Sequence, residues 1–207
     1  MRIHDPTHLY TGEVTGGTYK AAKIISFITQ PQLFSIILFA IVCTACTNLS
    51  SYAVSYGICL FFGCIFPIAE VLFYSKKFHN DDGDVVRRED RFIPLLLGVL
   101  SYVLGVIALW FAGAPWLITV LFICYAVVTF AITIITNWWK ISIHACGMIG
   151  PTMAIAHLYF PWGFLLLLLV PPICWSRYVL KKHTPAQMAG GIVVGFVLTA
   201  VIFVLLL

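Results

Sequence analysis

The sequence contains few charged residues and has long stretches with none. Only 10% of its 207 residues are charged and 61% are hydrophobic, against about 25% and 45–50% in a typical soluble domain. No charged residue occurs between Phe92 and Trp139 or between Thr184 and Leu207, and Glu70 is the only one between Gln32 and Ser75. Because a transmembrane helix needs about 20 mostly apolar residues, this excludes a soluble globular protein and predicts several membrane spans.

The sequence also lacks the signatures of a metal site, of a disulfide framework and of a secretory signal peptide. The seven cysteines lie in or beside apolar runs, and the CxxC pair Cys43 and Cys46 has no second pair of matching spacing. We interpret the cysteines as packing residues and expect neither a disulfide framework nor a zinc site. The acidic cluster in 81–90 is interpreted as a solvated mixed-charge loop, so no metal or other cofactor is expected. No cleavable signal peptide is expected in the first 30 residues, which lack a compact apolar core.

Helix breakers and polar clusters predict an all-α, polytopic bundle of transmembrane helices. We place seven spans at about 33–48, 52–74, 92–112, 115–137, 143–159, 162–179 and 185–207. Pro171-Pro172 should kink or break the sixth of these seven spans. If the region 143–179 is irregular, six spans remain. Residues 1–30 are predicted to form an interfacial segment, and 31–207 the transmembrane domain.

The basic residues predict the orientation of this bundle. All twelve Lys and Arg residues lie in the N-terminal segment or in the second, fourth and sixth connections between spans. The first, third and fifth connections, at 48–51, 112–116 and 158–162, contain none. The positive-inside rule therefore puts the basic side in the cytoplasm. We expect a multi-pass protein of the plasma membrane whose functional side faces the cytoplasm, with membrane lipids as partners and no nucleic acid.

Potentially reactive and anion-binding side chains gather on the same side. Ionisable groups at membrane depth are costly and are by default candidates for function. The second, fourth and sixth connections contribute Arg88, Arg91, Lys140, Ser142, His144, Arg177 and His183.

Three short motifs in these connections resemble those of the type 2 phosphatidic acid phosphatase family. Ser176-Arg177, five residues and then His183 reproduce its Ser-Arg-x5-His core. Ser142-Ile143-His144 resembles its Pro-Ser-Gly-His motif, and Arg91 followed by Pro94 resembles its Lys-x6-Arg-Pro motif. The motifs occur in the family's order and on one membrane side, and the resemblance covers roughly residues 76–195.

The sequence also departs from the family pattern. Ile141 and Ile143 replace the Pro and Gly of the second motif, and Asp84 stands where the first motif has Lys. Lys140 is therefore a candidate for part of the first motif's role. The family's final Asp, four residues after the nucleophilic His, is Gln187 here. Thr184-x-x-Gln187 is also a capping-box pattern, so Gln187 either orients the nucleophile, or caps the last helix, or does both.

The resemblance implies metal-independent hydrolysis of a lipid phosphate or polyprenyl diphosphate. His183 would attack phosphorus and form a phosphohistidine, and His144 would protonate the leaving alcohol and then activate water. Phosphate-binding groups would be Arg177, Arg91, Arg88, Lys140 and Ser142.

Two alternative functions remain open from the sequence. A lipid phosphotransferase would use a second alcohol in place of water, and a non-catalytic lipid transporter or lipid-binding protein would keep only the fold. Members of the family commonly face the outside or a lumen, whereas the charges here place the site in the cytoplasm. We give the charges more weight because all twelve basic residues agree.

Overall fold

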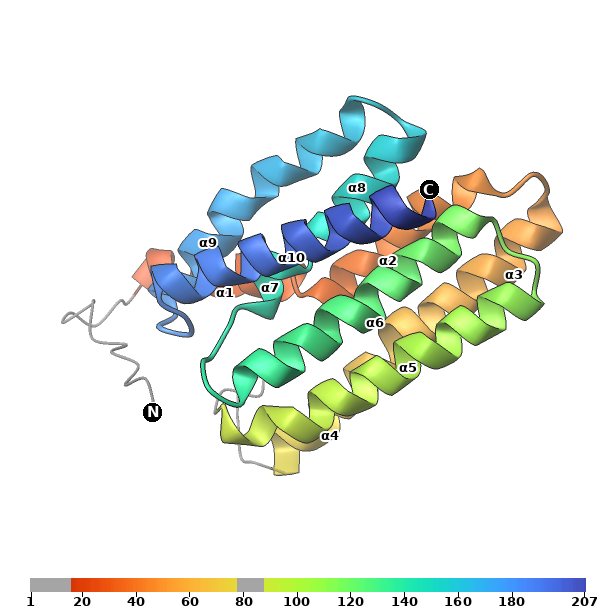
Figure 1. The fold of residues 1–207 in the computed structure, drawn as a ribbon. Coiled ribbons are helices and arrows are strands. Elements are labelled where there is room, and N and C mark those ends of the chain that lie inside the picture. Colours follow the sequence, from red (N-terminus) through yellow and green to blue (C-terminus); the bar gives the residue numbers. More distant parts are fainter. Residues whose placement is uncertain (1–15, 78–87) are drawn as a thin grey trace.

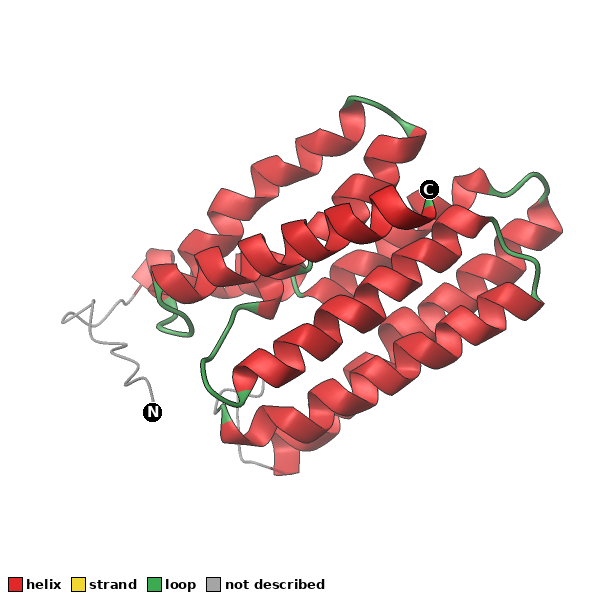
Figure 2. Cartoon of the chain, viewed as in Figure 1, coloured by secondary structure: helices red, strands yellow, loops and turns green. Residues whose placement is uncertain are grey.

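The computed structural model describes residues 16–77 and 88–207, and every regular element in these ranges is a helix (Figures 1 and 2). In chain order the elements are α1 (Gly16–Ile28), α2 (Pro31–Val42), η1 (Cys43–Ala45), α3 (Leu49–Leu60), the π-helix η2 (Phe61–Ile65), α4 (Phe66–Lys77), η3 (Glu89–Arg91), α5 (Phe92–Phe111), α6 (Trp116–Thr136), α7 (Ile143–Cys146), α8 (Ile149–Leu158), η4 (Trp162–Leu169), α9 (Val170–Val179) and α10 (Pro185–Leu206). The predicted all-α architecture is confirmed.

Long apolar helices make the chain an integral membrane protein. Within the described residues, five helices are long and apolar enough to cross a membrane: Leu49–Lys77, Glu89–Phe111, Trp116–Thr136, Trp162–Val179 and Pro185–Leu206. A sixth is added if the pair Gly16–Ile28 and Pro31–Ala45, bent by 49°, counts as one broken span. The predicted count of seven is therefore too high, and the alternative of six agrees with the upper count.

Two of the seven predicted spans account for this difference. The span placed at 33–48 is the second half of the bent pair, and its helix α2 has only 12 residues. The span placed at 143–159 is a short apolar helix, Ile143–Leu158, divided between α7 and α8. Its 16 residues reach about 24 Å at 1.5 Å per residue, less than the roughly 30 Å of a bilayer core.

The irregularity predicted at Pro171-Pro172 is found at the start of α9. The chain forms a 3-10 helix from Trp162 to Leu169 and becomes an α-helix at Val170. The prolines lie in the first turn of α9, where a missing backbone N–H breaks no helical hydrogen bond. The sixth predicted span thus changes helix type at this point.

The connections alternate between the two ends of the bundle. The end of α4, the start of α5 and the α6–α7 and α9–α10 connections lie at one end together with α1, and the turns after η1, α5 and α8 lie at the other (Figure 1). We call the first the basic end, because its connections carry the described residues Arg88, Arg91, Lys140, Arg177, Lys181 and Lys182, and the second the far end. The structure thus brings the three motif-bearing connections to one end.

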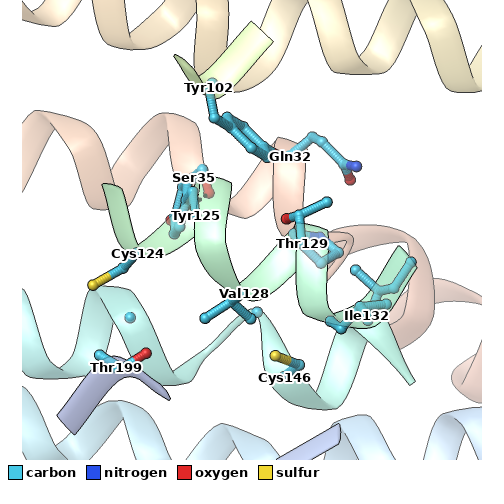
Figure 3. Close-up of a pocket in the computed structure, with 15 residues that line it drawn as sticks. Gln32, Ser35, Tyr102, Cys124, Tyr125, Val128, Thr129, Ile132, Cys146 and Thr199 are labelled. Carbon is cyan, nitrogen blue, oxygen red and sulfur yellow. Dashed lines mark hydrogen bonds between the residues drawn. The ribbon is translucent and has the colours of Figure 1, made fainter. Parts of the chain in front are cut away.

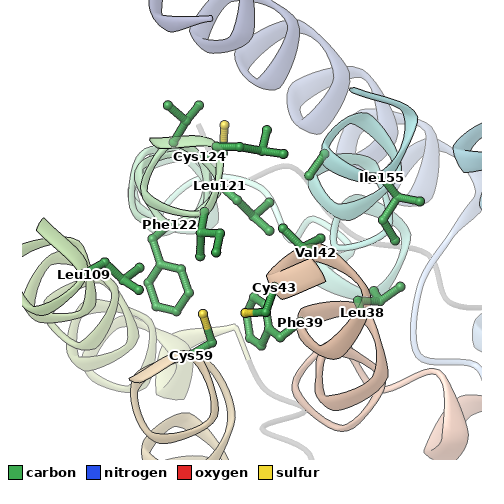
Figure 4. Packing of buried hydrophobic residues seen from close by; sticks show 14 of the residues in the cluster. Leu38, Phe39, Val42, Cys43, Cys59, Leu109, Leu121, Phe122, Cys124 and Ile155 are labelled. Atoms are coloured by element: carbon green, nitrogen blue, oxygen red, sulfur yellow. The ribbon is translucent and has the colours of Figure 1, made fainter. Parts of the chain in front are cut away.

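The main apolar cluster packs α2, α3, α5, α6 and α8 together (Figure 4). The rings of Phe39 and Phe122 stack at its centre with centroids 5.4 Å apart. Gly63 and Gly105 make room for them, because a Cβ atom there would lie 2.4 Å and 2.5 Å from the nearest ring carbons. The buried cysteines of this cluster, which include Cys59, fill space in it, as predicted for packing residues.

Helix α1 lies within the segment 1–30 that is predicted to be interfacial, and it contacts the bundle. Helix α1 packs against α9 and buries Ala22 and Ser26. It still exposes Ile24 and Phe27 on its outer side, at 58% and 65%. The boundary predicted at residue 30 coincides with the break between α1 and α2, where Gln30 precedes Pro31.

Candidate active site

The chain reaches His183 through a tightly specified turn at the end of α9. Lys181 adopts a left-handed conformation with φ of 55°. The Lys182 N–H donates to the Arg177 carbonyl at 3.0 Å, and the Lys181 N–H donates to the Tyr178 carbonyl at 2.9 Å. This pair of bonds is a Schellman motif, which satisfies the last carbonyls of a helix. It fixes the chain direction one residue before His183.

The other side of His183 is fixed by the start of α10. The Thr184 hydroxyl accepts a hydrogen bond from the Gln187 N–H at 3.3 Å. The Gln187 side-chain oxygen accepts from the Thr184 N–H at 3.1 Å, which completes a capping box. Pro185 lies in the first turn, which its fixed φ suits. The capping box predicted from the sequence is confirmed, and with it the start of α10 beside the histidine.

Gln187 also holds the imidazole of His183. Its Oε1 atom lies 3.3 Å from His183 Nδ1, and both side chains are buried, with 0% and 3% exposure. An amide oxygen can only accept, so this bond requires the hydrogen on Nδ1. In a neutral ring the Nε2 lone pair is then available for bonding. One side-chain atom, Oε1 of Gln187, therefore makes both the capping contact and the contact to His183.

His183 lies among positive groups contributed by all three basic connections. Burial is the main cause that lowers the pKa of His183 well below its usual value of 6.5. Positive charge lowers this pKa further, and it comes from Arg91, Arg177, Lys140 and His144. The fold therefore gathers these predicted residues around one ring and keeps that ring neutral at neutral pH.

Arg177 is buried one and a half turns before His183. Its side chain is 3% exposed, and its Nη1 atom donates to the Ser26 hydroxyl of α1 at 2.7 Å. Ser26 was not predicted as a site residue. The only local signal is a small polar residue four positions after Ala22, on the same helical face, and this says nothing about a contact with α9.

The second motif is anchored to α10 by its serine. Ser142 is fully buried and caps α7 by accepting the Ala145 N–H at 3.4 Å. Its own N–H donates to the Gln187 carbonyl at 3.2 Å. A Cβ atom at Gly191 would lie only 2.4 Å from the Ser142 carbonyl oxygen, so glycine permits this approach. These contacts fix the backbone at Ser142, two residues before His144.

The two histidines line one cavity of about 60 Å³. We call it the histidine pocket. Its lining consists of Gln30, Pro31, Gln32, Val71, Arg91, Pro94, Leu95, Ile143, His144 and His183. Gln30, Pro31 and Gln32 begin α2 and were not expected at the site. Their contribution depends on tertiary packing, so sequence spacing carried no sign of it.

The two arginines of the second connection that were predicted as site residues occupy different places. Arg91 is 4% exposed, and its Nη1 atom donates to the Ile141 carbonyl at 3.4 Å. Arg88 instead donates to the Trp138 carbonyl at 2.8 Å and lies 3.6 Å from the Glu89 carboxylate. Arg88 lines a separate cavity of about 300 Å³ and is absent from the lining of the histidine pocket. This placement does not support its predicted role in phosphate binding.

The acidic segment contributes no cluster of metal ligands in the described part. Among residues 16–77 and 88–207, no three His, Cys, Asp or Glu side chains come together as a metal site. Glu89 and Asp90 belong to the short helix η3. The predicted solvated loop at 81–87, including Asp84, lies outside the described residues.

A neutral imidazole, a second histidine and several cations in one buried site suit the transfer of an anionic group. The first ring has a free lone pair for attack, the second can move a proton, and the cations can stabilise negative charge away from bulk water. Comparisons of the chain with protein-family models, curated proteins and solved structures found no match.

Proposed function

We propose that this protein is a membrane phosphatase that hydrolyses a lipid phosphate or polyprenyl diphosphate through a phosphohistidine. One observation carries the proposal: Gln187 holds Nδ1 of a buried His183, and His144 and Arg91 line the same pocket. The resemblance of the three motifs to type 2 phosphatidic acid phosphatases supports the same chemistry. The attacking residue, the proton donor and the cations would otherwise be unrelated polar groups buried at high energetic cost.

The first step transfers the phosphoryl group to the enzyme. The Nε2 lone pair of His183 attacks phosphorus, and the bond from phosphorus to the lipid oxygen breaks. His144 donates a proton to that oxygen, so the leaving group departs as an alcohol or, from a diphosphate, as a monophosphate. Arg177, Arg91 and Lys140 stabilise the negative charge on the phosphoryl oxygens during the transfer.

The second step releases phosphate and restores the enzyme. His144, now unprotonated, removes a proton from water, and the resulting oxygen attacks phosphorus as the phosphorus–nitrogen bond breaks. Neutral His183 and inorganic phosphate are the products. The lowered pKa of His183 suits this cycle, because the ring is unprotonated before the substrate arrives.

Substrate binding would also balance the positive charge around His183. The same positive groups that lower the pKa of His183 are balanced by the two negative charges of a bound phosphate monoester. Gln187 is neutral and cannot balance a charge on the ring as a carboxylate would. We therefore expect the phosphate itself to supply the negative charge that other members of the family place on the protein.

We further propose that the site faces the cytoplasm at the plasma membrane. The positive-inside rule supports this orientation, because the basic end carries the connections rich in Lys and Arg. A cysteine placed at Pro115, in the turn at the far end, should react with an impermeant maleimide added outside intact cells. One placed at Lys182 should react only after permeabilisation, and the reverse pattern would overturn the orientation.

Phosphate release by the purified protein tests the function. Phosphatidate, phosphatidylglycerophosphate and a polyprenyl diphosphate in mixed micelles are the substrates, with and without EDTA. His183→Ala should abolish release, and His157→Ala is the matched control because His157 is exposed near the far end of α8. Acid-labile phosphate on His183 after rapid quenching would support the intermediate.

The outcomes separate the candidate functions. Full activity in His183→Ala, or no release from any substrate, would overturn the proposal. A requirement for an added acceptor alcohol, with phosphate recovered on that alcohol, would indicate a phosphotransferase. Loss of activity in EDTA that magnesium restores would contradict the metal-independent mechanism.

A further inference from the structure

The cavity that Arg88 lines is larger than the histidine pocket and separate from it. It measures about 300 Å³ and is lined by residues from the start of α5 and the end of α6, at the basic end. It shares no lining residue with the histidine pocket or with a cavity of about 60 Å³ in the bundle interior. That interior cavity has no Asp, Glu, Lys, Arg or His in its lining (Figure 3). The larger one, which we call the α5–α6 cavity, therefore has room for a ligand of its own.

The α5–α6 cavity presents one cation beside one anion. Arg88 and Glu89 are the only charged residues among the seven that line it. The Arg88 Nη2 atom lies 3.6 Å from the Glu89 carboxylate, and Nη1 donates to the Trp138 carbonyl at 2.8 Å. A guanidinium has five N–H donors, so Arg88 can bind a further acceptor while keeping both contacts. The cavity thus offers neighbouring places for a negative and a positive group.

The remaining lining adds an acceptor and two aromatic rings. The Asn137 side-chain nitrogen donates to the Thr133 carbonyl at 3.3 Å, which leaves the amide oxygen as an acceptor. Phe92 and Trp138 are exposed. An ammonium group is attracted to the face of an aromatic ring, most strongly to tryptophan. These groups therefore favour a positive group on the side of the cavity that faces Glu89.

Exposed apolar side chains continue from the cavity along both helices. Residues three or four positions apart lie on one face of a helix, so each set forms a stripe that leads towards the middle of the membrane. The stripes are Phe92, Leu96 and Leu100 on α5 and Val127, Phe130 and Ile134 on α6. A ligand with hydrocarbon chains attached to a polar headgroup would cover them, and a soluble ligand would not.

We infer that the α5–α6 cavity binds the headgroup of a zwitterionic phospholipid of the surrounding membrane. The lipid phosphate accepts hydrogen bonds from Arg88. The ammonium group lies near the Glu89 carboxylate, the Asn137 amide oxygen and the Trp138 ring. The acyl chains extend along the apolar stripes of α5 and α6. An anionic lipid such as phosphatidylglycerol could use only Arg88, because its headgroup brings no cation to Glu89.

Native mass spectrometry of the purified protein in detergent tests this site. Phosphatidylethanolamine, phosphatidylcholine and phosphatidylglycerol with the same acyl chains are added in turn, and the Kd of the first bound lipid is measured. Glu89→Gln removes the anion, and its side chain is 62% exposed, so the variant should fold. Asp90→Asn is the matched control, because Asp90 follows Glu89 in η3 and is absent from the cavity lining. Thermal melting checks that each variant is folded.

We expect the wild type to bind the two zwitterionic lipids about tenfold more tightly than phosphatidylglycerol, which corresponds to about 1.4 kcal/mol. Glu89→Gln should remove this preference by weakening only the zwitterionic lipids, and Asp90→Asn should keep it. Arg88→Gln should weaken all three lipids, because each carries a phosphate. Lys77→Gln, at the end of α4 and outside the cavity lining, should match the wild type.

Three results would overturn the inference. They are equal binding of phosphatidylglycerol and the zwitterionic lipids by the wild type, equal changes in Glu89→Gln and Asp90→Asn, and competition by O-phosphoethanolamine as strong as by the intact lipid. The last result would indicate a soluble ligand. None of these measurements needs turnover, so the outcome is independent of the proposed phosphatase activity.

Discussion

The far half and the basic half of this bundle are held together by different kinds of buried group. In the far half the large buried side chains are apolar, and Phe39, Leu109 and Phe122 are all 0% exposed. In the basic half the chain buries Arg177 and His183 to 3% exposure. Apolar groups lose nothing when removed from water, whereas each polar group needs a partner. Under the proposed function, the far half would provide stability and the basic half the chemistry.

The buried polar groups of the basic half differ among themselves in how well they are satisfied. Arg177 donates to Ser26, and Gln187 accepts from both Thr184 and His183. Both carboxylate oxygens of Glu70, a residue only 8% exposed, are among the buried atoms that make no hydrogen bond within the described ranges, and the Nε atom of Arg177 is another. The groups placed around His183 are thus built into a network, and Glu70 is outside it.

The largest expected effect tests the chemical half. His144→Ala should lower the turnover of lipid substrates by about 10²–10⁴-fold, the usual contribution of a general acid or base, with an unchanged melting temperature. With p-nitrophenyl phosphate, whose leaving group needs no proton, the variant should release a burst of one p-nitrophenol per enzyme and then stall as the phosphohistidine. Stopped-flow absorbance measures this. Steady wild-type turnover would remove His144 from the mechanism.

The next largest effect tests the packing half. Leu109→Ala should lower the free energy of unfolding by about 2–5 kcal/mol, because it leaves a cavity in the apolar cluster. Activity per folded molecule should not change, since Leu109 does not line the histidine pocket. Ile107→Ala, at a 46% exposed position on the same helix, is the control. A catalytic defect in folded Leu109→Ala protein would contradict the assignment of stability to the far half and of chemistry to the basic half.

A smaller effect concerns the charge around His183. Because burial first and positive neighbours second lower the pKa of His183, the neutral nucleophile should persist below pH 6.5, and the acidic limb of kcat/KM should lie below that value. Lys140→Met removes one of these charges, so it should raise the pKa of His183 and move the limb to higher pH. Lys77→Met is the control, since Lys77 is a basic residue at the end of α4 that is not among the charges acting on His183. If the acidic limb stays at the same pH in Lys140→Met, the effect assigned to Lys140 on the pKa of His183 is wrong.

The sequence predicted the parts of this site that depend on local spacing. The capping box needs only residues three apart, and the basic connections follow from charge counting along apolar spans. It could not predict that Ser26 meets Arg177, 151 positions away, or that Arg88 turns to the Trp138 carbonyl. Both contacts depend on how α1 and α6 pack, and side-chain type alone does not encode that.

The smallest expected effect separates the two roles of Gln187 within the chemical half. Thr184→Ala removes the hydroxyl that caps the Gln187 N–H but leaves the bond between Gln187 and His183. It should lower the free energy of unfolding by about 0.5–2 kcal/mol, as other cap losses do, with little change in rate. Gln187→Ala removes the cap and the orienting bond together, so it should show a similar stability loss and also a lower kcat with little change in KM.

Gln187→Asp sharpens this last comparison, because a carboxylate can both accept from Nδ1 and stabilise a positively charged ring. It should stay active, raise the pKa of His183 and move the acidic limb of kcat/KM upward, and the carboxylate should also suit the N-terminal end of α10. The shorter side chain still lies one helical turn from His183. If Gln187→Ala and Thr184→Ala lose the same stability and neither loses rate, Gln187 only caps the helix. His183 would then be held by packing, and the orienting role assigned to the amide oxygen would be wrong.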